Sequence, residues 1–215
     1  MDGNGRWAKK RMMPRTYGHK VGAEAFRKVV EYCGQIGVKH VTVYAFSTEN
    51  WKRPKAEIEA IFNLFDSFIR QEEEKSEETR YRIVFIGDKA PFDEELRNRM
   101  INLENKTRNN GFTVNVGINY GGRAEIVNAV NKLISEGKTQ ITEEDISRNV
   151  YTSESPDPDM IVRTGGEYRT SNFLMWQSAY SELYVTDTLW PDMNEAEIDK
   201  IVLEYNKRNR RFGGL

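Results

Sequence analysis

The chain of 215 residues is poor in the residues that build disulfides and zinc sites, with one cysteine, Cys33, and two histidines. A single cysteine excludes an internal disulfide and is typical of a reducing compartment, so we expect a cytoplasmic protein. One cysteine and two histidines are too few for a zinc site of the usual kind. We interpret Cys33 as a small apolar residue of a helix.

Long hydrophobic runs are also missing, so the sequence predicts no membrane-spanning helix, and no secretory signal pattern opens the chain. The formal net charge of −1 gives no general reason to expect binding to nucleic acid. Basic residues nevertheless gather within residues 1–20, where Asp2 is the one acidic residue against Arg6, Lys9, Lys10, Arg11, Arg15 and Lys20. Such a concentration of positive charge favours an anionic ligand.

The length and the patterning predict one α/β domain over residues 1–215. Apolar spacing predicts helices over residues 20–35, 55–70, 93–108 and 194–210, and one of about 14 residues after 120–123. Runs rich in β-formers predict strands over residues 38–46, 82–87, 112–119, 159–163 and 182–185. The acidic run 71–78 is interpreted as a mobile connection.

This alternation favours a mostly parallel central sheet with helices on both faces. Ligands bind at the carboxyl ends of the strands in such sheets. Polar loops follow the predicted strands after Phe46, Asn119 and Val162. We therefore expect these three loops to converge on one crevice.

Two stretches, residues 1–7 and 163–172, combine glycine with arginine. Glycine lets the main chain approach an anion closely, and the arginine fork matches phosphate oxygens. Two such stretches indicate two phosphorylated substrates or one large one. The pattern Gly3-x-Gly5-x-x-Ala8 also matches the dinucleotide fingerprint, but without a preceding strand in this chain it is a weak signal.

Several polar residues near these stretches leave alternatives open. Asp2 either binds a divalent cation that bridges it to phosphate, with Glu182 as a second carboxylate, or it caps a helix. His19 and Asn50 either relay a proton or hold a loop. His40, at the start of a strand, is interpreted as structural.

The predicted helix 55–70 has an apolar face that is wider than a narrow stripe. It is either ordinary core or, in part, the wall of a cavity that suits a lipid diphosphate. The apolar residues concerned are Ile58, Ile61, Phe62, Leu64, Phe65, Phe68 and Ile69.

Six blocks of the sequence, in this order, resemble the motifs of the cis-prenyltransferases, and among them those of the bacterial undecaprenyl diphosphate synthases. They are residues 2–8 with Gly18-His19, residues 44–54, residues 119–123, residues 156–159, residues 163–172 and residues 181–184. The resemblance continues to residues 210–215. It implies that farnesyl diphosphate is extended by successive isopentenyl diphosphate units, in cis configuration and with Mg²⁺, to a long-chain polyprenyl diphosphate, the lipid carrier precursor of cell-wall synthesis.

The resemblance also implies roles for residues at matching positions. Asp2 would bind the metal with Glu182, and Ser47, Asn50, His19 and Asp2 would take part in catalysis. The allylic diphosphate would be held by Gly3, Asn4, Gly5, Arg6, Arg15 and Arg53. The isopentenyl diphosphate would be held by Arg163, Arg169 and Ser171. Further substrate contacts would come from Trp7, Glu49, Trp51 and Thr170.

Members of this family are homodimers, so we expect a homodimer in which Glu182 acts from across the interface and residues 211–213 reach a neighbouring site. An apolar tunnel beside the sheet would hold the growing chain, and membrane contact would be peripheral at most. Family members have a hydrophobic strand directly before the aspartate, which this chain, starting at Met1, does not contain. Two alternatives are a non-catalytic partner subunit of a heteromeric prenyltransferase and another phosphate-binding α/β enzyme, such as a nucleotide-dependent one.

Overall fold

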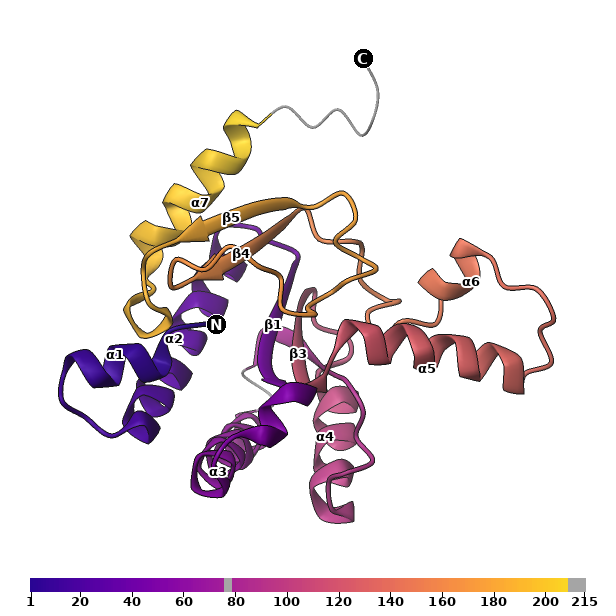
Figure 1. Ribbon diagram of the computed structural model, residues 1–215, viewed down its shortest axis with the longest axis horizontal. Helices are drawn as coiled ribbons and strands as arrows, with labels where there is room; N and C mark the ends of the chain where they lie inside the picture. The colour runs from indigo at the N-terminus through magenta and orange to yellow at the C-terminus, as the bar shows by residue number, and fades with distance from the viewer. Residues whose placement is uncertain (76–78, 209–215) are drawn as a thin grey trace. The chain divides into compact units, whose positions relative to one another are not determined.

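The computed structural model describes residues 1–75 and 79–208, and these form two compact units. The first unit comprises residues 1–37, 157–170 and the described residues from 177 onward, and the second comprises residues 38–156 and 171–176. The helices and strands are labelled in Figure 1.

The second unit is built on a parallel sheet of three strands in the order β1 (His40–Ser47), β3 (Phe112–Tyr120), β2 (Tyr81–Ile86). The central strand β3 is buried from Thr113 to Tyr120, as expected for a strand with neighbours on both sides. Its run of β-branched residues suits this position, since such side chains pack well on a pleated surface.

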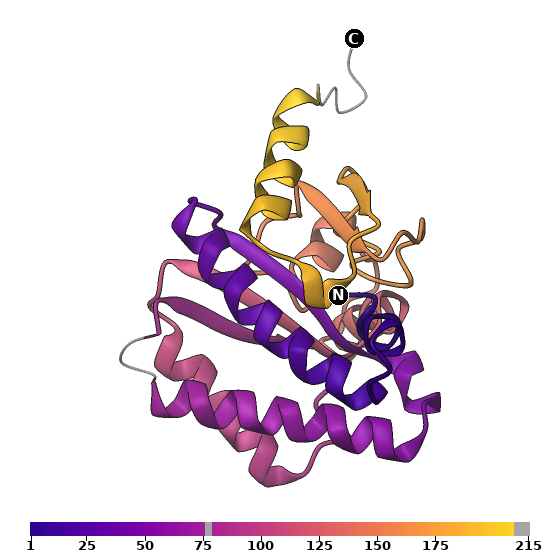
Figure 2. The same ribbon diagram turned by 90° about the vertical axis from the view of Figure 1, so that its left-hand side faces the viewer.

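Two crossover helices, α3 (Lys55–Glu74) and α4 (Glu94–Thr107), connect these strands and pack against each other on the same side of the sheet (Figure 2). Phe65 of α3 meets Phe85 of β2 edge-to-face, with 5.5 Å between the ring centroids. The Thr107 hydroxyl oxygen accepts a hydrogen bond from the Ile83 N–H at 3.0 Å. This bond satisfies a main-chain donor at the edge strand β2, which would otherwise be open to pairing with another strand.

The remaining elements of the second unit follow β1 and β3. A 3₁₀ helix, η1 (Thr48–Lys52), follows β1, and helix α5 (Gly122–Ser135) follows β3. The short helix α6 (Glu143–Ser147) comes next along the chain, and its Ile146 forms a buried apolar cluster with Leu133 and Val150.

The first unit combines α1 (Asn4–Lys10), α2 (Arg15–Gln35) and α7 (Glu195–Lys207) with a pair of parallel strands and the short helix η2 (Trp190–Asp192). The strands are β4 (Met160–Thr164) and β5 (Glu182–Thr186). Trp190 donates its indole N–H to the Gly22 carbonyl at 2.8 Å, and this bond joins η2 to the middle of α2. Trp7 and Ala8 of α1 pack with Leu189 in a small buried cluster.

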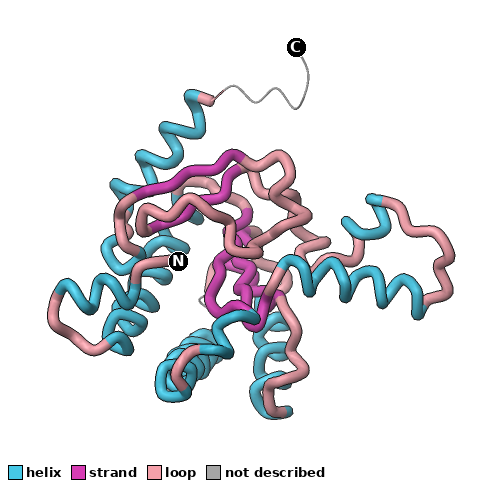
Figure 3. The backbone as a smooth tube through the Cα atoms, in the orientation of Figure 1, coloured by secondary structure: helices cyan, strands magenta, loops and turns pink. Residues whose placement is uncertain are grey.

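The structure confirms the predicted α/β class and the parallel arrangement, because every pair among the described strands is parallel. The described strands lie in two sheets, of three and of two strands, where a single central sheet was expected (Figure 3). Cys33 is a buried residue of α2, as interpreted, and His40 Nδ1 lies 3.2 Å from the Ser155 hydroxyl oxygen. A single domain over residues 1–215 stays a prediction.

The interpretation of residues 71–78 as a mobile connection was wrong for residues 71–74, which continue α3. Glu72 is buried and accepts a hydrogen bond from the Thr79 hydroxyl at 3.2 Å. Glu73 pairs with Arg99 of α4 at 2.9 Å. Paired carboxylates hold a helix in place, whereas a run of like charges read alone suggests solvation. Residues 76–78 lie outside the described part of the chain.

Candidate active site

The start of the chain is bound to the carboxyl end of β4. The Thr164 hydroxyl accepts a hydrogen bond from the Asp2 N–H and donates one to the Asp2 carbonyl, each at 2.8 Å. Gly3 then takes a left-handed φ of +114° at the N-terminus of α1, where a Cβ would lie 2.8 Å from the Leu189 side chain. The glycine is therefore required by both conformation and space.

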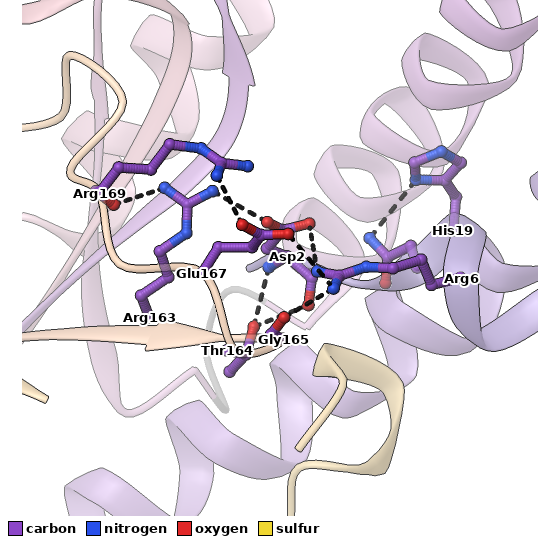
Figure 4. Close-up of polar contacts among 9 residues, drawn as sticks. Asp2, Arg6, His19, Arg163, Thr164, Gly165, Glu167 and Arg169 are labelled. Atoms are coloured by element: carbon purple, nitrogen blue, oxygen red, sulfur yellow. Dashed lines mark hydrogen bonds and ion pairs between the residues drawn. The ribbon is translucent and has the colours of Figure 1, made fainter. Parts of the chain in front are cut away.

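The carboxylate of Asp2 points to two arginines (Figure 4). Arg163 donates to Oδ2 at 2.9 Å, and the Arg6 guanidinium lies 3.4 Å from Oδ1. Burial would raise the pKa of Asp2, but the hydrogen bond from Arg163 and the charges of both arginines lower the pKa below its usual range. The sequence left two roles open for Asp2, a metal ligand or a helix cap. The cap is excluded within the described structure, because Gly3 is the N-cap of α1 and no side chain caps that helix.

Arg6 extends from α1 to the loop after β4. Its Nη1 donates to the Gly165 carbonyl at 2.6 Å and lies 3.7 Å from the Glu167 carboxylate. Gly165 has a φ of +84°, and a Cβ there would lie 2.3 Å from the Arg6 guanidinium. Glycine at position 165 thus leaves the space that the arginine occupies.

Glu167 joins the two predicted phosphate-binding stretches. One carboxylate oxygen faces Arg6, and the other accepts a hydrogen bond from Arg169 at 2.6 Å. Arg163 donates to the Arg169 carbonyl at 2.6 Å and so fixes the same loop. Asp2, Arg6, Arg163, Glu167 and Arg169 therefore form one cluster in the first unit, as Figure 4 shows.

The cluster can exchange its internal ion pairs for a ligand. The side chains of Arg6 and Arg169 are 44% and 57% exposed, whereas that of Arg163 is 15% exposed. Three guanidinium groups face two carboxylates, which leaves one positive charge in excess. Exposed ion pairs contribute little stability, so an anion such as a diphosphate can displace the Glu167 carboxylate from Arg6 and Arg169 at small cost.

Close packing of α1 on α2 places the other predicted residues of the first stretch. A Cβ at Gly18 would lie 2.1 Å from the Asn4 carbonyl oxygen, so the helices can cross here only at glycine. A Cβ at Gly5 would lie 3.0 Å from the Arg15 guanidinium, which lies over that position. The Asn4 amide is 3.5 Å from His19 Nδ1. Asn4, Gly5, Arg15 and His19 are thus brought together in the first unit.

Trp7 stabilises the position of α1. Its indole N–H donates to Asp192 at 2.6 Å, its ring stacks on Tyr17, and the Arg11 guanidinium lies 4.0 Å from the ring centroid. With 8% exposure, Trp7 is part of the packing beneath the site. A direct contact of Trp7 with substrate stays a prediction.

In the second unit, the loops after β1 and β3 meet, as their positions at strand ends predict. The Asn50 side-chain oxygen accepts a hydrogen bond from the Ser47 N–H at 3.2 Å. Trp51 donates from its indole to the Asn119 side-chain oxygen at 2.8 Å and stacks on Phe62 of α3. Ser47, Asn50 and Trp51 are therefore held together at the carboxyl end of this sheet.

Arg53 forms an ion pair with Glu57 at 3.0 Å, and Glu57 is a buried residue of α3. Thr170 is the last residue of its segment in the first unit, and Ser171 begins the segment 171–176 of the second. Both are exposed.

Comparison with known proteins decides the family. A family model described as "Putative undecaprenyl diphosphate synthase" matches residues 1–213. The chain belongs to this family. The isoprenyl transferase of Fusobacterium nucleatum subsp. nucleatum is 53% identical over 216 residues, covering 100% of this chain and 94% of the relative. The isoprenyl transferase of Aquifex aeolicus is 46% identical over 214 residues, covering 99% of this chain and 93% of the relative.

Two solved structures agree with this assignment. A probable undecaprenyl diphosphate synthase from Campylobacter jejuni matches with a TM-score of 0.82 and 35% identity over 90% of this chain and 92% of that one. Lavandulyl diphosphate synthase from Lavandula x intermedia, in complex with dimethylallyl diphosphate, matches with a TM-score of 0.92 and 29% identity over 99% and 95%. The chain is thus an enzyme of the undecaprenyl diphosphate synthase type, and its predicted fold class is that of its relatives.

The family is Mg²⁺-dependent, and Asp2 is the candidate ligand in this member. The described residues contain no group of three or more His, Cys, Asp or Glu side chains that could hold a metal. Mg²⁺ nevertheless commonly uses one or two carboxylates together with substrate phosphates. An ionised Asp2 beside arginines that can bind phosphate fits that pattern.

Glu182 is not a neighbour of Asp2 within one chain. It lies opposite Met160 at the start of the β4–β5 pair, whereas Asp2 is bound to Thr164 at the other end. Four residues of strand separate them, about 13 Å at the usual rise. Glu182 instead accepts a hydrogen bond from Arg208 at 2.7 Å. A role for Glu182 at the metal of a neighbouring subunit stays a prediction.

Two residues of this site were missed in the sequence analysis. Glu167 lies within the arginine-glycine stretch 163–172. An acidic residue among arginines that are expected to bind phosphate indicates an ion-pair partner for them, so Glu167 could have been identified from the sequence. Asn172 follows Ser171, and its role depends on contacts with residues far away along the chain, so no local pattern of residues indicates it. Among the described residues, no helix is long and apolar enough to cross a membrane.

Proposed function

We propose that this enzyme condenses farnesyl diphosphate with successive isopentenyl diphosphate units in cis configuration and releases a long-chain polyprenyl diphosphate of the undecaprenyl class. The observation that carries the proposal is the cluster of Arg6, Arg163 and Arg169 with Asp2 and Glu167. The cluster brings the arginines of the two glycine-arginine stretches side by side, and the condensation needs two diphosphates side by side.

Each group of residues is assigned one substrate. Arg6, Arg15 and Arg53, with Gly3, Asn4 and Gly5, hold the allylic diphosphate. Arg163 and Arg169, with Thr170 and Ser171, hold the isopentenyl diphosphate. The related lavandulyl diphosphate synthase was solved in complex with dimethylallyl diphosphate, also an allylic diphosphate, which supports binding of that class of substrate.

The reaction makes one carbon–carbon bond in each cycle. The double bond of isopentenyl diphosphate attacks the first carbon of the allylic substrate, the bond from that carbon to the diphosphate oxygen breaks, and the isopentenyl unit loses a proton. Negative charge develops on the departing diphosphate, and guanidinium groups fixed in place stabilise it. Ser47, Asn50 and His19 assist this departure and the removal of the proton.

Asp2 would hold Mg²⁺, and the bound cation would help to neutralise the charge on the leaving diphosphate. The low pKa of Asp2 keeps the carboxylate ionised and ready to bind a cation at neutral pH. When substrate enters, Arg163 and Arg6 can turn from Asp2 to the phosphates. Asp2 then retains the charge that the metal requires.

Helix α3 forms one wall of the tunnel for the growing chain. Ile58, Ile61 and Phe62, in its first half, are only partly buried, whereas Phe65, Phe68 and Ile69 are buried. The first half therefore offers apolar surface to a hydrocarbon ligand, and the second half belongs to the core. Burial of apolar ligand surface on these residues would favour chain growth along the helix.

The enzyme acts as a cytoplasmic homodimer, with peripheral membrane contact at most during product release. Glu182 would serve the site of the neighbouring subunit, since it is distant from Asp2 in its own chain. The tail residues 211–213, which would reach the neighbouring site, lie outside the described residues. A single buried cysteine, Cys33, is consistent with a reducing compartment.

The proposal is tested by incubating the protein with farnesyl diphosphate, labelled isopentenyl diphosphate and Mg²⁺, followed by chromatography of the products and NMR analysis of the new double bonds. The expected result is a ladder of products with cis double bonds, ending in a long chain. Absence of any extension by the purified homomer would contradict the proposal and favour a non-catalytic partner subunit. Heat stabilisation by nucleotides but not by farnesyl diphosphate would favour an enzyme of another class.

A further inference from the structure

The segment Ser171–Leu174 has an unusual backbone. Ser171, Asn172 and Leu174 have φ angles of 52°, 64° and 47°, so three of four consecutive residues are left-handed without being glycine. Such conformations persist only where the surroundings hold them, and they gather at functional sites. This segment begins with Ser171, one of the residues assigned to isopentenyl diphosphate.

Helix α5 and the aromatic core hold one side of the segment. The Asn172 side-chain oxygen accepts a hydrogen bond from the Arg123 N–H at 2.9 Å, and its carbonyl accepts one from the Gly122 N–H at 2.8 Å. The neighbouring Phe173 stacks on Tyr44, with 4.7 Å between the ring centroids. Asn172 thereby satisfies two of the main-chain donors that the start of a helix leaves open.

The other side of Asn172 binds the loop after β1. Its amide nitrogen donates to a Glu49 carboxylate oxygen at 3.0 Å. Gly121 leaves room for this contact, because a Cβ there would lie 2.7 Å from the Thr48 hydroxyl and 2.9 Å from the Asn172 amide nitrogen. One side chain therefore joins the start of α5 to η1.

Glu49 is ionised in this arrangement. Burial would raise its pKa, but hydrogen bonds from its own backbone, from the Asn172 amide and from the hydroxyls of Ser47 and Thr48 lower the pKa below its usual range. The hydrogen bond from Asn172 is thus assisted by a full negative charge and is stronger than one between neutral groups.

We propose that Asn172 is a positioning residue that joins the main chain at Ser171 to the loop carrying Ser47 and Asn50, through its bond to Glu49 within the second unit. The inference rests on the proposed function, which assigns Ser171 to the isopentenyl diphosphate and Asn50 to the departure of the allylic diphosphate. Asn172 is the direct neighbour of Ser171, and Glu49 is the direct neighbour of Asn50. A single hydrogen bond therefore couples the position of Ser171 to that of Asn50 within the second unit.

The substitution Asn172→Asp isolates this bond. An aspartate can still accept the hydrogen bond from Arg123, but it places a second carboxylate where the amide donated to Glu49. Two carboxylates at this distance resist being ionised together, and one of them gains a raised pKa. We expect kcat/KM for isopentenyl diphosphate to fall at least about tenfold at pH 8 and the ratio of variant to wild-type activity to rise as the pH is lowered.

The double variant Asn172→Asp with Glu49→Gln restores a hydrogen bond in the opposite direction. The new amide at position 49 can donate to the new carboxylate at position 172. Recovery to within about threefold of the single Glu49→Gln variant supports the proposal. Asn149→Asp is the matched control, because Asn149 also donates from its amide, to the Asp145 carbonyl at 2.9 Å, in the same unit. This control is expected to keep wild-type activity at every pH.

Each outcome decides the proposal. Equal activity of Asn172→Asp and Asn149→Asp, or an impaired Asn172→Asp that Glu49→Gln does not rescue, overturns it. If Asn172→Asp alone does not fold, the double variant decides, since restored folding and turnover support the bond and continued failure rejects it. An inactive wild-type enzyme would instead reject the proposed function, so the two failures are distinguishable.

Discussion

The crossing of α1 over α2 at Gly18 gives the sharpest quantitative prediction. In Gly18→Ala the new Cβ would lie 2.1 Å from the Asn4 carbonyl oxygen, where real contacts of Cβ atoms are essentially never below 3.0 Å. The neighbouring atom belongs to the main chain of Asn4, so the side chains cannot relieve the overlap and α1 must move by about 1 Å. Overpacking of this kind costs about 1–3 kcal/mol, and the better helix propensity of alanine offsets up to about 1 kcal/mol of it.

The stability loss is therefore small, about 0–3 kcal/mol, which lowers Tm by up to about 12 °C in a chain of this size. The loss of activity is larger, because α1 carries Asn4, Gly5 and Arg6. A displacement of about 1 Å at groups that bind the reacting centre can lower the rate about 100-fold. Steady-state kinetics and thermal unfolding on the same samples separate the two effects.

Gly111→Ala is the matched control, since nothing lies within 4 Å of a Cβ there and its φ is not positive. We expect this variant to keep its activity and its Tm. Gly22→Ala is intermediate, because its Cβ would meet the Asn4 side chain, which can rotate. Full activity of Gly18→Ala, within about twofold of wild type, would refute the reasoning that this crossing positions the site.

The other predictions concern Asp2 and the buried pair of Tyr120 and Glu125. Asp2→Ala is expected to lower turnover at least about 100-fold with farnesyl diphosphate binding mostly kept, as read from kinetics beside equilibrium titration; unchanged turnover would reject the metal role. The Asp2 pKa is lowered in the folded state, so the stabilisation from its ion pairs is present above its ordinary value of 3.8 and is lost as the pH falls below it. Urea unfolding between pH 7 and pH 3 should therefore show a smaller acid-induced loss of stability in Asp2→Asn than in wild type, and equal losses would contradict this. Tyr120 donates to the buried Glu125 carboxylate at 2.5 Å, so Tyr120→Phe is expected to lower the free energy of unfolding by about 1–3 kcal/mol in denaturant titrations, and an unchanged midpoint would count against that bond.

Strongly periodic segments were predictable from the sequence, whereas short elements held by tertiary contacts were not. The apolar spacing of residues 55–70 and the β-branched run of residues 112–119 correspond to α3 and β3 with small changes at the ends. Helix α1 was missed because a seven-residue segment that follows Gly3 and contains Gly5 has little helix propensity of its own. It forms because Trp7 and Ala8 pack on Leu189.

For the site, the sequence identified which residues carry charge but not how they pair. Arg6 and Arg169 are 163 residues apart in the chain and meet at Glu167. Asp2 was compatible with a helix cap and with a metal ligand; the structure excludes the cap, because Gly3 is the N-cap of α1, and it adds an ion pair with Arg163. Pairing of this kind depends on which loops the fold brings together, and residue spacing does not report it.

In the proposed function, two groups of arginines bind two diphosphates at the same time. Calorimetric titration with Mg²⁺, isopentenyl diphosphate and an unreactive thio-analogue of farnesyl diphosphate tests it most directly, using wild type, Arg6→Ala and Arg169→Ala. We expect two sites in each chain. Arg169→Ala should weaken binding of isopentenyl diphosphate at least about tenfold and binding of the analogue less than about twofold. Arg6→Ala should weaken binding of the analogue at least about tenfold and binding of isopentenyl diphosphate less than about twofold. A single site for which the two ligands compete, or equal weakening of both ligands by both variants, would contradict it.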